Sequence, residues 1–299
     1  MNTVKLTDKI NSNKTVVAVG NFDGVHKGHA ALIKKAVSLA EEYNCTPAVW
    51  TFTDYAPKKD AKHIIQPRER YEIFKELGLK LVFENDFSDV RDFSAGEFVK
   101  NVLIEKCGAV YAVCGFNFRF GKGASGDAAA LKSLMEKNGA KAEIINEIQI
   151  NGITVSSTAV RAALCRGDVE LAAELTGRPF SVTLPVIHGR RIGTGLGFPT
   201  INQAYPDNLT ELRRGVYVCR VEADGKTYRA VTNVGVKPTV KSDGVSIETH
   251  IIGYDGDLYG RDITVTFLRF LRDERKFSSL EELKKQIEKD KKRAEEEQI

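Results

Sequence analysis

The first half of the chain alternates short apolar runs with stretches in which apolar residues recur at helical spacing. Residues 16–19 form a continuous apolar run, which is typical of a parallel strand buried on both faces. From Ala30 to Tyr43 the apolar residues recur every three or four positions, which predicts a helix. The same alternation predicts strands at 46–52, 79–84, 109–114 and 142–147, and helices at 67–77, 94–107, 127–138, 156–164 and 168–177. This repeated strand–helix order predicts an α/β domain with a doubly wound parallel sheet.

Local signals sharpen some of these boundaries. Ser94 and Glu97 have the spacing of a capping box at the start of a helix. Ser157 is the expected N-cap of the helix that follows it. Residues 151–152, Asn-Gly, predict a two-residue hairpin turn just before that helix.

After Pro179 the helical spacing gives way to closely spaced β-rich runs. They lie at 180–188, 215–223, 226–235, 245–252 and 262–271. The Asp-Gly pairs at 224–225 and 255–256 predict hairpin turns between strands. Strands without intervening helices predict an antiparallel barrel or sandwich. The highly charged stretch 281–298 predicts a solvated terminal helix.

Length and composition support this division. At 299 residues the chain is long enough for two domains, which we expect at 1–179 and 180–299. With 42% hydrophobic and 28% charged residues, it has the composition of an ordinary globular protein. Its net charge of +4 is too small to predict nucleic-acid binding and suits small anionic ligands. Five scattered cysteines, with no apolar signal core or membrane span in the sequence, predict a cytoplasmic protein without a membrane partner.

The stretch GNFDGVHKGH at 20–29 lies between the first predicted strand and the first predicted helix. A helix start after a parallel strand offers free N–H groups and the positive end of the helix dipole, which favour an anion. Glycines let the backbone approach a ligand closely. The candidate phosphate-binding residues here are Gly20, Asn21, Phe22, Asp23 and Gly24, and the candidate catalytic residues are His26 and His29. A histidine pair that merely caps the helix is equally compatible with the spacing, whereas a metal site would need further ligands.

Two further stretches of the first half carry phosphate-binding residue types. GFNFRFGKG at 115–123 follows a predicted parallel strand and supplies Asn117 and Arg119, so it could fold over a nucleotide or be only a mobile glycine loop. The overlapping GKGASG matches a dinucleotide fingerprint by letter, but it does not follow its strand directly, so we reject that interpretation. SSTAVR at 156–161 either simply begins a helix or binds phosphate, through Ser156, Ser157, Thr158 and Arg161.

In the second half, GTGLGFPTIN at 193–202 is a glycine-rich loop that contains Gly193, Gly195 and Gly197 and leads to Thr200 and Asn202. Small oxygen ligands beside such a loop suit Mg²⁺ and ATP phosphates, although an ordinary Gly-Pro turn would have the same pattern.

The run VSIETHII at 245–252 alternates as a strand. Alternation places Ile247 and Thr249 on one face, and Glu248 and His250 on the other. If the second face lines a barrel, Glu248 is a candidate general base. A solvent-facing glutamate is the competing interpretation.

Together these motifs resemble the bifunctional prokaryotic riboflavin kinase/FMN adenylyltransferase (FAD synthetase) family over nearly the whole chain. GNFDGVHKGH, GFNFRFGKG, SSTAVR, GFPTIN, GVY, ETH, GDLYG and LRDERKF occur in the order and approximate spacing of that family. Eight ordered motifs are far more specific than any one of them. The resemblance implies an N-terminal FMN adenylyltransferase domain of the HxGH nucleotidyltransferase type. It also implies a C-terminal riboflavin kinase domain on a six-stranded antiparallel β-barrel with a C-terminal helix.

The resemblance implies a role for each matching residue in the first domain. His26 and His29 would stabilise charge on the phosphates of ATP while the phosphate of FMN attacks the α-phosphorus and pyrophosphate leaves. Asn117 and Arg161 would hold nucleotide phosphates. No protein nucleophile is needed, so catalysis is positioning plus electrostatics.

In the kinase domain, the resemblance implies that Thr200 and Asn202 serve Mg²⁺ and ATP. Glu248 would take the proton from the ribityl hydroxyl that attacks the γ-phosphate of ATP. The implied ligands are riboflavin, FMN, FAD and ATP.

One segment departs from the family pattern. Members usually carry a TFxPHP-like stretch after the second strand, whereas this chain has TFTDYAPKK at 51–59. The expected histidine is missing; Tyr55 and Ala56 stand nearby, and Lys58 and Lys59 follow. A riboflavin kinase with a weak or inactive adenylyltransferase domain is therefore a close alternative.

Two other classes of protein share some of these motifs. A class I aminoacyl-tRNA synthetase also has an HxGH turn, but the sequence has no KMSKS-like loop. A non-catalytic flavin or nucleotide sensor would not need Glu248, Thr200 and both histidines together. We therefore expect an enzyme.

Overall fold

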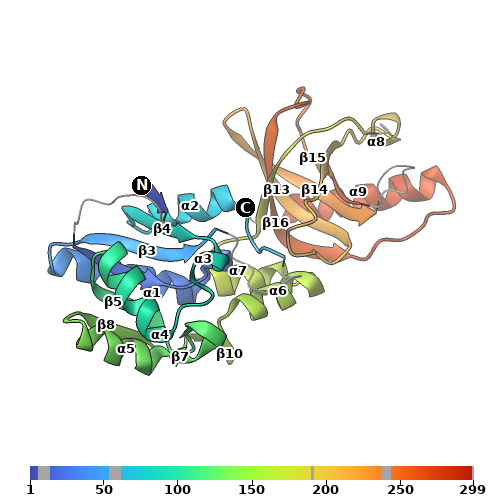
Figure 1. The fold of residues 1–299 in the computed structure, drawn as a ribbon. Helices are drawn as coiled ribbons and strands as arrows, with labels where there is room; N and C mark the ends of the chain where they lie inside the picture. Colours follow the sequence, from blue (N-terminus) through green and yellow to red (C-terminus); the bar gives the residue numbers. More distant parts are fainter. Residues whose placement is uncertain (6–13, 54–61, 190–191, 237–243, 298–299) are drawn as a thin grey trace. The chain divides into compact units, whose positions relative to one another are not determined.

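The computed structural model describes residues 1–5, 14–53, 62–189, 192–236 and 244–297, which fold into two compact units. The first unit is Met1–Ser157 and the second is Thr158–Ile299 (Figure 1). The units thus divide before the two helices that precede residue 180. The boundary at 179/180 between two functional domains stays a prediction.

The first unit is built on the predicted parallel sheet. Its six strands lie in the order β1 (Asn2–Lys5), β4 (Leu81–Asn85), β3 (Thr46–Phe52), β2 (Thr15–Val19), β5 (Ala109–Gly115) and β8 (Lys141–Ile145). Every neighbouring pair is parallel. The strand order reverses direction at β2, which has β3 on one side and β5 on the other. In such sheets ligands bind at the carboxyl ends of the strands flanking the reversal.

Sequence did not predict β1, a four-residue edge strand beside β4. The predicted helices of this unit are present. They are α1 (Lys27–Glu42), α2 (Pro67–Glu76), α4 (Ala95–Glu97), the π-helix Phe98–Lys106 that continues α4, and α5 (Ala128–Lys137). A further short helix, α3 (Phe87–Val90), was not predicted. The capping box of Ser94 and Glu97 is present as predicted. A core of residues from β2, β3, β5 and the π-helix, among them Val17, Trp50 and Leu103, packs against one face of the sheet.

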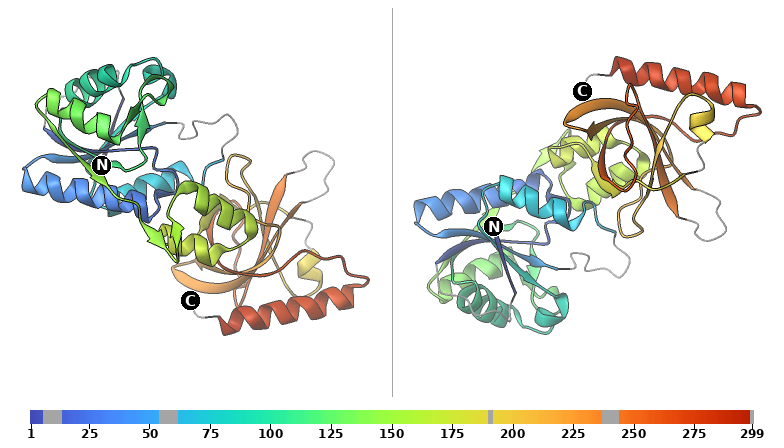
Figure 2. Two further views of the ribbon diagram at one scale, coloured as in Figure 1. Left: turned by 90° about the horizontal axis from the view of Figure 1, so that it is seen from below. Right: turned by 90° about the horizontal axis from the view of Figure 1, so that it is seen from above.

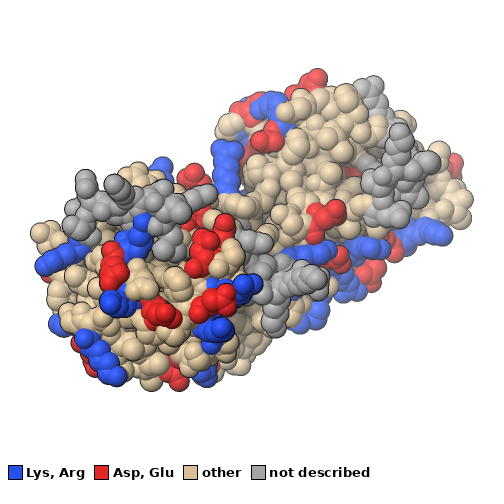
Figure 3. Space-filling view, viewed as in Figure 1, with Lys and Arg blue, Asp and Glu red and all other residues tan. Residues whose placement is uncertain are grey.

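Two short hairpins complete the first unit. Strands β6 (Arg119–Phe120) and β7 (Gly126–Asp127) pair next to α5. Strands β9 (Gln149–Ile150) and β10 (Ile153–Thr154) flank the predicted Asn-Gly turn, which is confirmed. On the face drawn in Figure 3, basic side chains lie among acidic ones over this unit.

The second unit begins within α6, at Thr158, and continues through α7 into a six-stranded antiparallel barrel. Its elements are α6 (Ser157–Arg166), α7 (Val169–Thr176), β11 (Ser181–Pro185), α8 (Ile192–Gly195), β12 (Ile201–Ala204), β13 (Gly215–Ala223), β14 (Lys226–Val236), β15 (Val245–Ile251), β16 (Asp262–Arg272) and α9 (Leu280–Glu296). The strand order is β11-β16-β13-β14-β15-β12. The barrel implied by the family resemblance is therefore present.

A buried side chain closes the barrel. The Nε2 group of Gln203 on β12 donates to the carbonyl of Leu184 on β11 at 2.7 Å and to that of Ile263 on β16 at 2.9 Å. A backbone bridge between Ile187 and Asn202 joins the same two edges. These contacts bring β12 to the open edge of the barrel sheet and fix its position.

The long helix α9 lies along the barrel (Figure 2). The predicted solvated helix is charged over much of its surface, but it buries Asp290, which is 1% exposed. Arg272 on β16 forms an ion pair with that carboxylate at 2.8 Å. This partner satisfies the buried charge and attaches the helix to the sheet.

Two local expectations are corrected by the structure. Residues 255–256 are no hairpin turn, because they lie in a longer connection from β15 to β16, which are not neighbours in the sheet. Ser157 is the first residue of α6 rather than its N-cap. Its hydroxyl donates instead to the carbonyl of Asp23 at 2.8 Å.

In the described part of the chain, none of the helices combines the length and the apolar character that a membrane span requires.

Candidate active sites

The turn between β2 and α1 has a strained backbone. Phe22 and Gly24 have left-handed φ angles of 55° and 77°. A Cβ at Gly24 would lie 2.9 Å from the side chain of Ile64, so packing also requires glycine there. Non-glycine residues with a left-handed backbone are often found at functional sites. Phe22 is a non-glycine residue with this conformation.

The two histidines of the turn lie against each other. Their ring centroids are 3.6 Å apart and the rings are inclined by only 16°. His26 is the N-cap of α1, because its Nδ1 accepts the backbone N–H of His29 at 3.2 Å. With Nδ1 as acceptor, the neutral ring of His26 carries its proton on Nε2. The capping role is therefore real for His26, and it orients the ring at the helix start where an anion is favoured.

Hydrogen bonds from three other segments hold this turn. The carboxylate of Asp23, which is buried, accepts the backbone N–H of Ile64 at 2.9 Å. The carbonyl of Asp23 accepts from Ser157, and the hydroxyl of Thr51 donates to the carbonyl of Asn21 at 3.1 Å. Asp23 thus shapes the turn. The structure brings Ser157 of the SSTAVR motif to the GNFDGVHKGH motif.

The GFNFRFGKG stretch is a packed hairpin rather than an isolated glycine loop. Its Phe120 belongs to the core, and the N–H of Lys122 donates to the carbonyl of Phe93 at 2.7 Å. A Cβ on Gly121 would come within 2.8 Å of the backbone nitrogen of Ala95. The hairpin is therefore anchored on the capping-box helix.

The candidate binding residues of this hairpin lie on its outside. Asn117 is exposed, two residues after the end of β5. Because β5 is parallel to β2, Asn117 follows the same sheet edge as Gly20. The exposed Arg119 lies 3.8 Å from Asp127, in an ion pair that solvent screens.

The second half of the SSTAVR motif lies on α6. Thr158 and Arg161 belong to the second unit. The proposed contacts of Ser156, Thr158 and Arg161 with phosphate stay predictions.

In the second unit, strand register brings together residues that are far apart in the sequence. Asn202 on β12 is directly opposite Glu248 on β15. On the other side of β15, Asn233 of β14 is also directly opposite Glu248. Side chains of directly opposed residues share one face of a sheet. The half-buried carboxyl group of Glu248 therefore lies between two amide-bearing residues.

The face of Glu248 differs from the expectation. Ile247 and Thr249 are fully buried, and the Thr249 hydroxyl hydrogen-bonds that of Thr232 across the strands at 3.0 Å. These residues face the interior of the barrel, so Glu248 lies on its outer face. Glu248 therefore does not line the barrel interior, and its role as the general base stays a prediction. Because Glu248 is half-buried, a simple solvent-facing glutamate does not describe it either.

Asn202 has a tightly shaped environment. It is 5% exposed, and a Cβ on Gly189 would lie 2.3 Å from its side-chain nitrogen. The Asn202 amide therefore fills a space that only glycine leaves open. The same amide lies 3.5 Å from the carbonyl of Thr200, the other proposed metal ligand. In the described residues, no three His, Cys, Asp or Glu side chains gather as a metal site.

The loop before Thr200 is also closely packed. The N–H groups of Leu196 and Phe198 both donate to the carbonyl of Gly193, at 3.1 and 2.8 Å. The ring of His250 hydrogen-bonds the carbonyl of Pro199 through Nδ1 at 2.9 Å. Burial lowers the pKa of His250, which favours the neutral ring. The ETH motif thus anchors the GFPT motif directly.

Sequence reasoning missed two neighbours of the kinase site. Gly189 carries no signal beyond being a glycine, because its role depends on the Asn202 side chain. Asn233 lies within the β-rich run 226–235, where only the strand register reveals that it faces Glu248. The Nδ2 of Asn233 also donates to Glu274 at 3.4 Å, so a second carboxylate lies nearby.

Comparison with known proteins agrees with this arrangement. Residues 8–159 match the FAD synthetase family model, and residues 176–297 match the riboflavin kinase family model. A bifunctional riboflavin kinase/FMN adenylyltransferase of Pseudomonas fluorescens is 36% identical over 92% of this chain and 90% of its own length. The protein of the same name from Bacillus subtilis is 34% identical over 94% and 92%.

A solved structure covers both units. The crystal structure titled as a macrolide-efflux protein from Streptococcus pneumoniae matches with a TM-score of 0.90 at 29% identity, over 99% of each chain. Two family models in the order adenylyltransferase then kinase, and relatives above 30% identity over nearly their whole length, establish the family. The chain belongs to the bifunctional riboflavin kinase/FMN adenylyltransferases.

Proposed function

We propose that this protein makes FMN from riboflavin and ATP, and then FAD from FMN and a second ATP. The second unit phosphorylates riboflavin and the first unit adenylylates FMN, releasing pyrophosphate. The observation that carries the proposal is that each unit gathers its own candidate site. One site is a stacked histidine pair at a helix start, and the other is a carboxylate between two amides.

In the adenylyl transfer, a phosphate oxygen of FMN attacks the α-phosphorus of ATP. A new P–O bond forms, the bond between the α-phosphorus and the bridging oxygen breaks, and pyrophosphate leaves. His26 and His29, with the first N–H groups of α1, stabilise the charge that develops on the phosphates. Asn117 holds the nucleotide, with Gly20, Asn21 and Gly24 forming close backbone contacts. A contact of Arg161 with the phosphates stays a prediction from the family resemblance.

In the kinase reaction, Glu248 accepts the proton of the ribityl hydroxyl of riboflavin as its oxygen attacks the γ-phosphorus. The bond to ADP breaks and FMN forms. A carboxylate on the outer face of the barrel is accessible to a substrate. A residue in the interior is surrounded by packed side chains and is not accessible. The loop at 193–200 lies beside the ATP phosphates.

A divalent cation fits the kinase site. The Asn202 side-chain oxygen and the Thr200 hydroxyl are the hard oxygen ligands that Mg²⁺ prefers, and the space beside Gly189 holds Asn202 in place. When bound, Mg²⁺ would neutralise charge on the ATP phosphates. We infer Mg²⁺ from this ligand chemistry.

We place the protein in the cytoplasm and give it small-molecule partners only. All five cysteines, which lie in the described residues, are free thiols, as expected in a reducing compartment. Riboflavin, FMN and ATP account for both sites, and neither site calls for nucleic acid.

The departure at 51–59 supports the alternative of a weak adenylyltransferase. Phe52 ends β3, whereas Tyr55, Ala56, Lys58 and Lys59 lie outside the described residues. The proposal that this half is active rests instead on the intact histidine turn.

One experiment tests the function. The protein is incubated with riboflavin, ATP and Mg²⁺, and the products are separated by chromatography over time. We expect FMN first and FAD later. FMN alone would favour the kinase with an inactive first unit, and no product from a folded protein that binds flavin would favour the sensor.

A further inference from the structure

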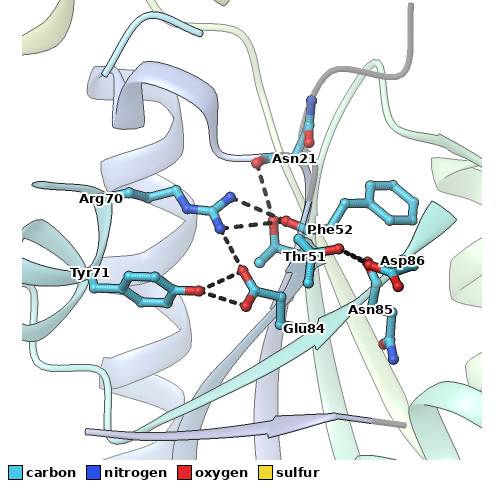
Figure 4. Close-up of polar contacts among 9 residues, drawn as sticks. Asn21, Thr51, Phe52, Arg70, Tyr71, Glu84, Asn85 and Asp86 are labelled. Carbon is cyan, nitrogen blue, oxygen red and sulfur yellow. Dashed lines mark hydrogen bonds and ion pairs between the residues drawn. The ribbon is translucent and has the colours of Figure 1, made fainter. Parts of the chain in front are cut away.

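A buried charged cluster lies behind the adenylyltransferase turn, on elements that carry none of its motifs. Arg70 on α2 is only 1% exposed. One of its guanidinium nitrogens lies 2.6 Å from the carboxylate of Glu84 on β4. The hydroxyl of Tyr71 donates to the same carboxylate at 2.6 Å (Figure 4).

The guanidinium also binds the end of a second strand. Both terminal nitrogens of Arg70 donate to the carbonyl of Phe52, at 3.3 and 3.4 Å. Phe52 is the last residue of β3. One planar group thus holds the carboxyl ends of β3 and β4 at fixed positions, a geometry that lysine cannot reproduce.

Stability alone is a weak reason for this cluster. Two buried charges lose their hydration, and well-packed apolar residues of similar size are often as stabilising or more so. Burial and the Glu84 contact raise the pKa of Tyr71 to about 12, so its hydroxyl remains a donor at any physiological pH. The cluster is therefore a fixed set of directional contacts, which hold neighbouring segments in defined positions.

Two routes lead from Arg70 to the histidine turn. Thr51 precedes Phe52 on β3, and its hydroxyl donates to the carbonyl of Asn21 at 3.1 Å (Figure 4). This route joins the strand end to the start of the turn.

The second route runs through aromatic packing. The guanidinium of Arg70 lies 5.8 Å from the ring centroid of Phe74. Phe74 meets Phe22 edge-on at 5.7 Å, and Phe22 lies 5.1 Å from the ring of His29. Phe22 has a left-handed backbone, which surrounding contacts must hold in place.

We propose that Arg70 is a positioning residue for adenylyl transfer, which holds the end of β3 and, through Thr51, Phe74 and Phe22, the turn that carries His29. This inference rests on the proposed adenylyltransferase activity of the first unit. It assigns Arg70 no contact with substrate. Its effect belongs to the geometry of the transition state, where a shift of about 1 Å can cost about 10²-fold in rate.

The test removes both charges together, because R70M alone would leave the buried carboxylate of Glu84 without its positively charged partner. The R70M/E84L variant should fold with a melting temperature close to that of the wild type. Its kcat for FAD formation from supplied FMN should fall by about 10- to 100-fold, with little change in KM for ATP. R70K should retain part of the activity. Riboflavin phosphorylation by the same molecules should not change.

A matched control is the partly exposed ion pair between Lys35 and Glu143, 3.0 Å apart in the same unit. K35M/E143L should leave both activities unchanged. If R70M/E84L folds and forms FAD with a normal kcat, the positioning role is wrong. A wild type that forms no FAD would instead refute the underlying function.

If the double variant does not fold, Thr51→Val decides the question. This change removes only the hydroxyl that binds the Asn21 carbonyl. We expect kcat for adenylyl transfer to fall several-fold while KM and the kinase rate stay constant. An unchanged kcat in T51V would overturn the proposal.

Discussion

The two candidate sites of this protein are built in opposite ways. The adenylyltransferase site is centred on one continuous stretch, 20–29, in which the turn from strand to helix itself shapes the anion site. The kinase site joins Asn202, Asn233 and Glu248, which lie on three separate strands. The first site depends on backbone conformation, and the second depends on strand register.

This difference determines how each site should fail. A single substitution in the turn acts on groups that face the phosphates directly. In the barrel, a substitution at a residue that packs against a site residue can displace that side chain, although the substituted residue itself does not contact the substrate. The predictions below separate the two units by measuring both activities in every variant, beginning with the largest expected effect.

Glu248→Gln should lower kinase turnover by roughly 10²–10⁴-fold, because glutamine keeps the shape but cannot accept the hydroxyl proton. FAD formation from supplied FMN should continue at the wild-type rate. The rates are measured by chromatography of the flavins, with Glu222→Gln on the exposed side of β13 as the control. A nearly normal kinase rate in E248Q would remove Glu248 from the mechanism.

His29→Ala should suppress FAD formation from FMN by about 10²–10³-fold, the usual effect of losing one donor to a developing charge. Riboflavin phosphorylation should remain near wild type, since His29 belongs to the first unit. Assays with FMN and with riboflavin as separate substrates measure the two rates. Equal loss of both activities in a folded variant contradicts the two-site account.

Gly189→Ala should lower the kinase rate by up to about 10²-fold, because the new methyl group displaces the Asn202 side chain. A titration with Mg²⁺ should show a higher concentration for half-maximal rate, and the adenylyl transfer rate should not change. Gly244→Ala, where a Cβ would meet nothing within 4 Å, is the matched control. A G189A variant with an unchanged Mg²⁺ requirement would argue against Asn202 as a metal ligand.

The smallest effect is expected at the departure from the family pattern. Replacing Tyr55-Ala56 with Pro-His should raise the rate of adenylyl transfer and leave the kinase rate constant. If the missing histidine limits adenylyl transfer, the wild-type protein should accumulate FMN well ahead of FAD. If the replacement does not change the adenylyl transfer rate, the missing histidine is compensated by neighbours such as Lys58, or the segment is peripheral.

The same contrast explains what the sequence could predict. The parallel sheet and the turn at 20–29 follow from local patterns, because apolar runs, helical spacing and glycines all lie within a few residues of one another. The stacking of His26 on His29 and the left-handed Phe22 are set by packing against α2 and residues around Ile64, so they could not be predicted.

The kinase site was less accessible to sequence reasoning. Alternation assigned the two faces of β15 correctly, but it could not decide which face encloses the barrel, because residues on both faces are buried. β12 has only four residues, and its partner Glu248 lies far along the chain. Likewise, the sequence shows Arg70 only as one charged residue in a predicted helix, and its buried ion pair with Glu84 becomes visible only in the structure.

The central claim is that two independent sites act in succession through free FMN. The most direct measurement mixes the H29A and E248Q proteins with riboflavin, ATP and Mg²⁺, beside each protein alone. Over the time in which the wild type forms FAD, we predict that H29A alone stops at FMN, that E248Q alone leaves most riboflavin unconverted, and that the mixture forms FAD. A folded variant that loses both activities, or a mixture that forms no FAD although E248Q converts supplied FMN, would contradict the account.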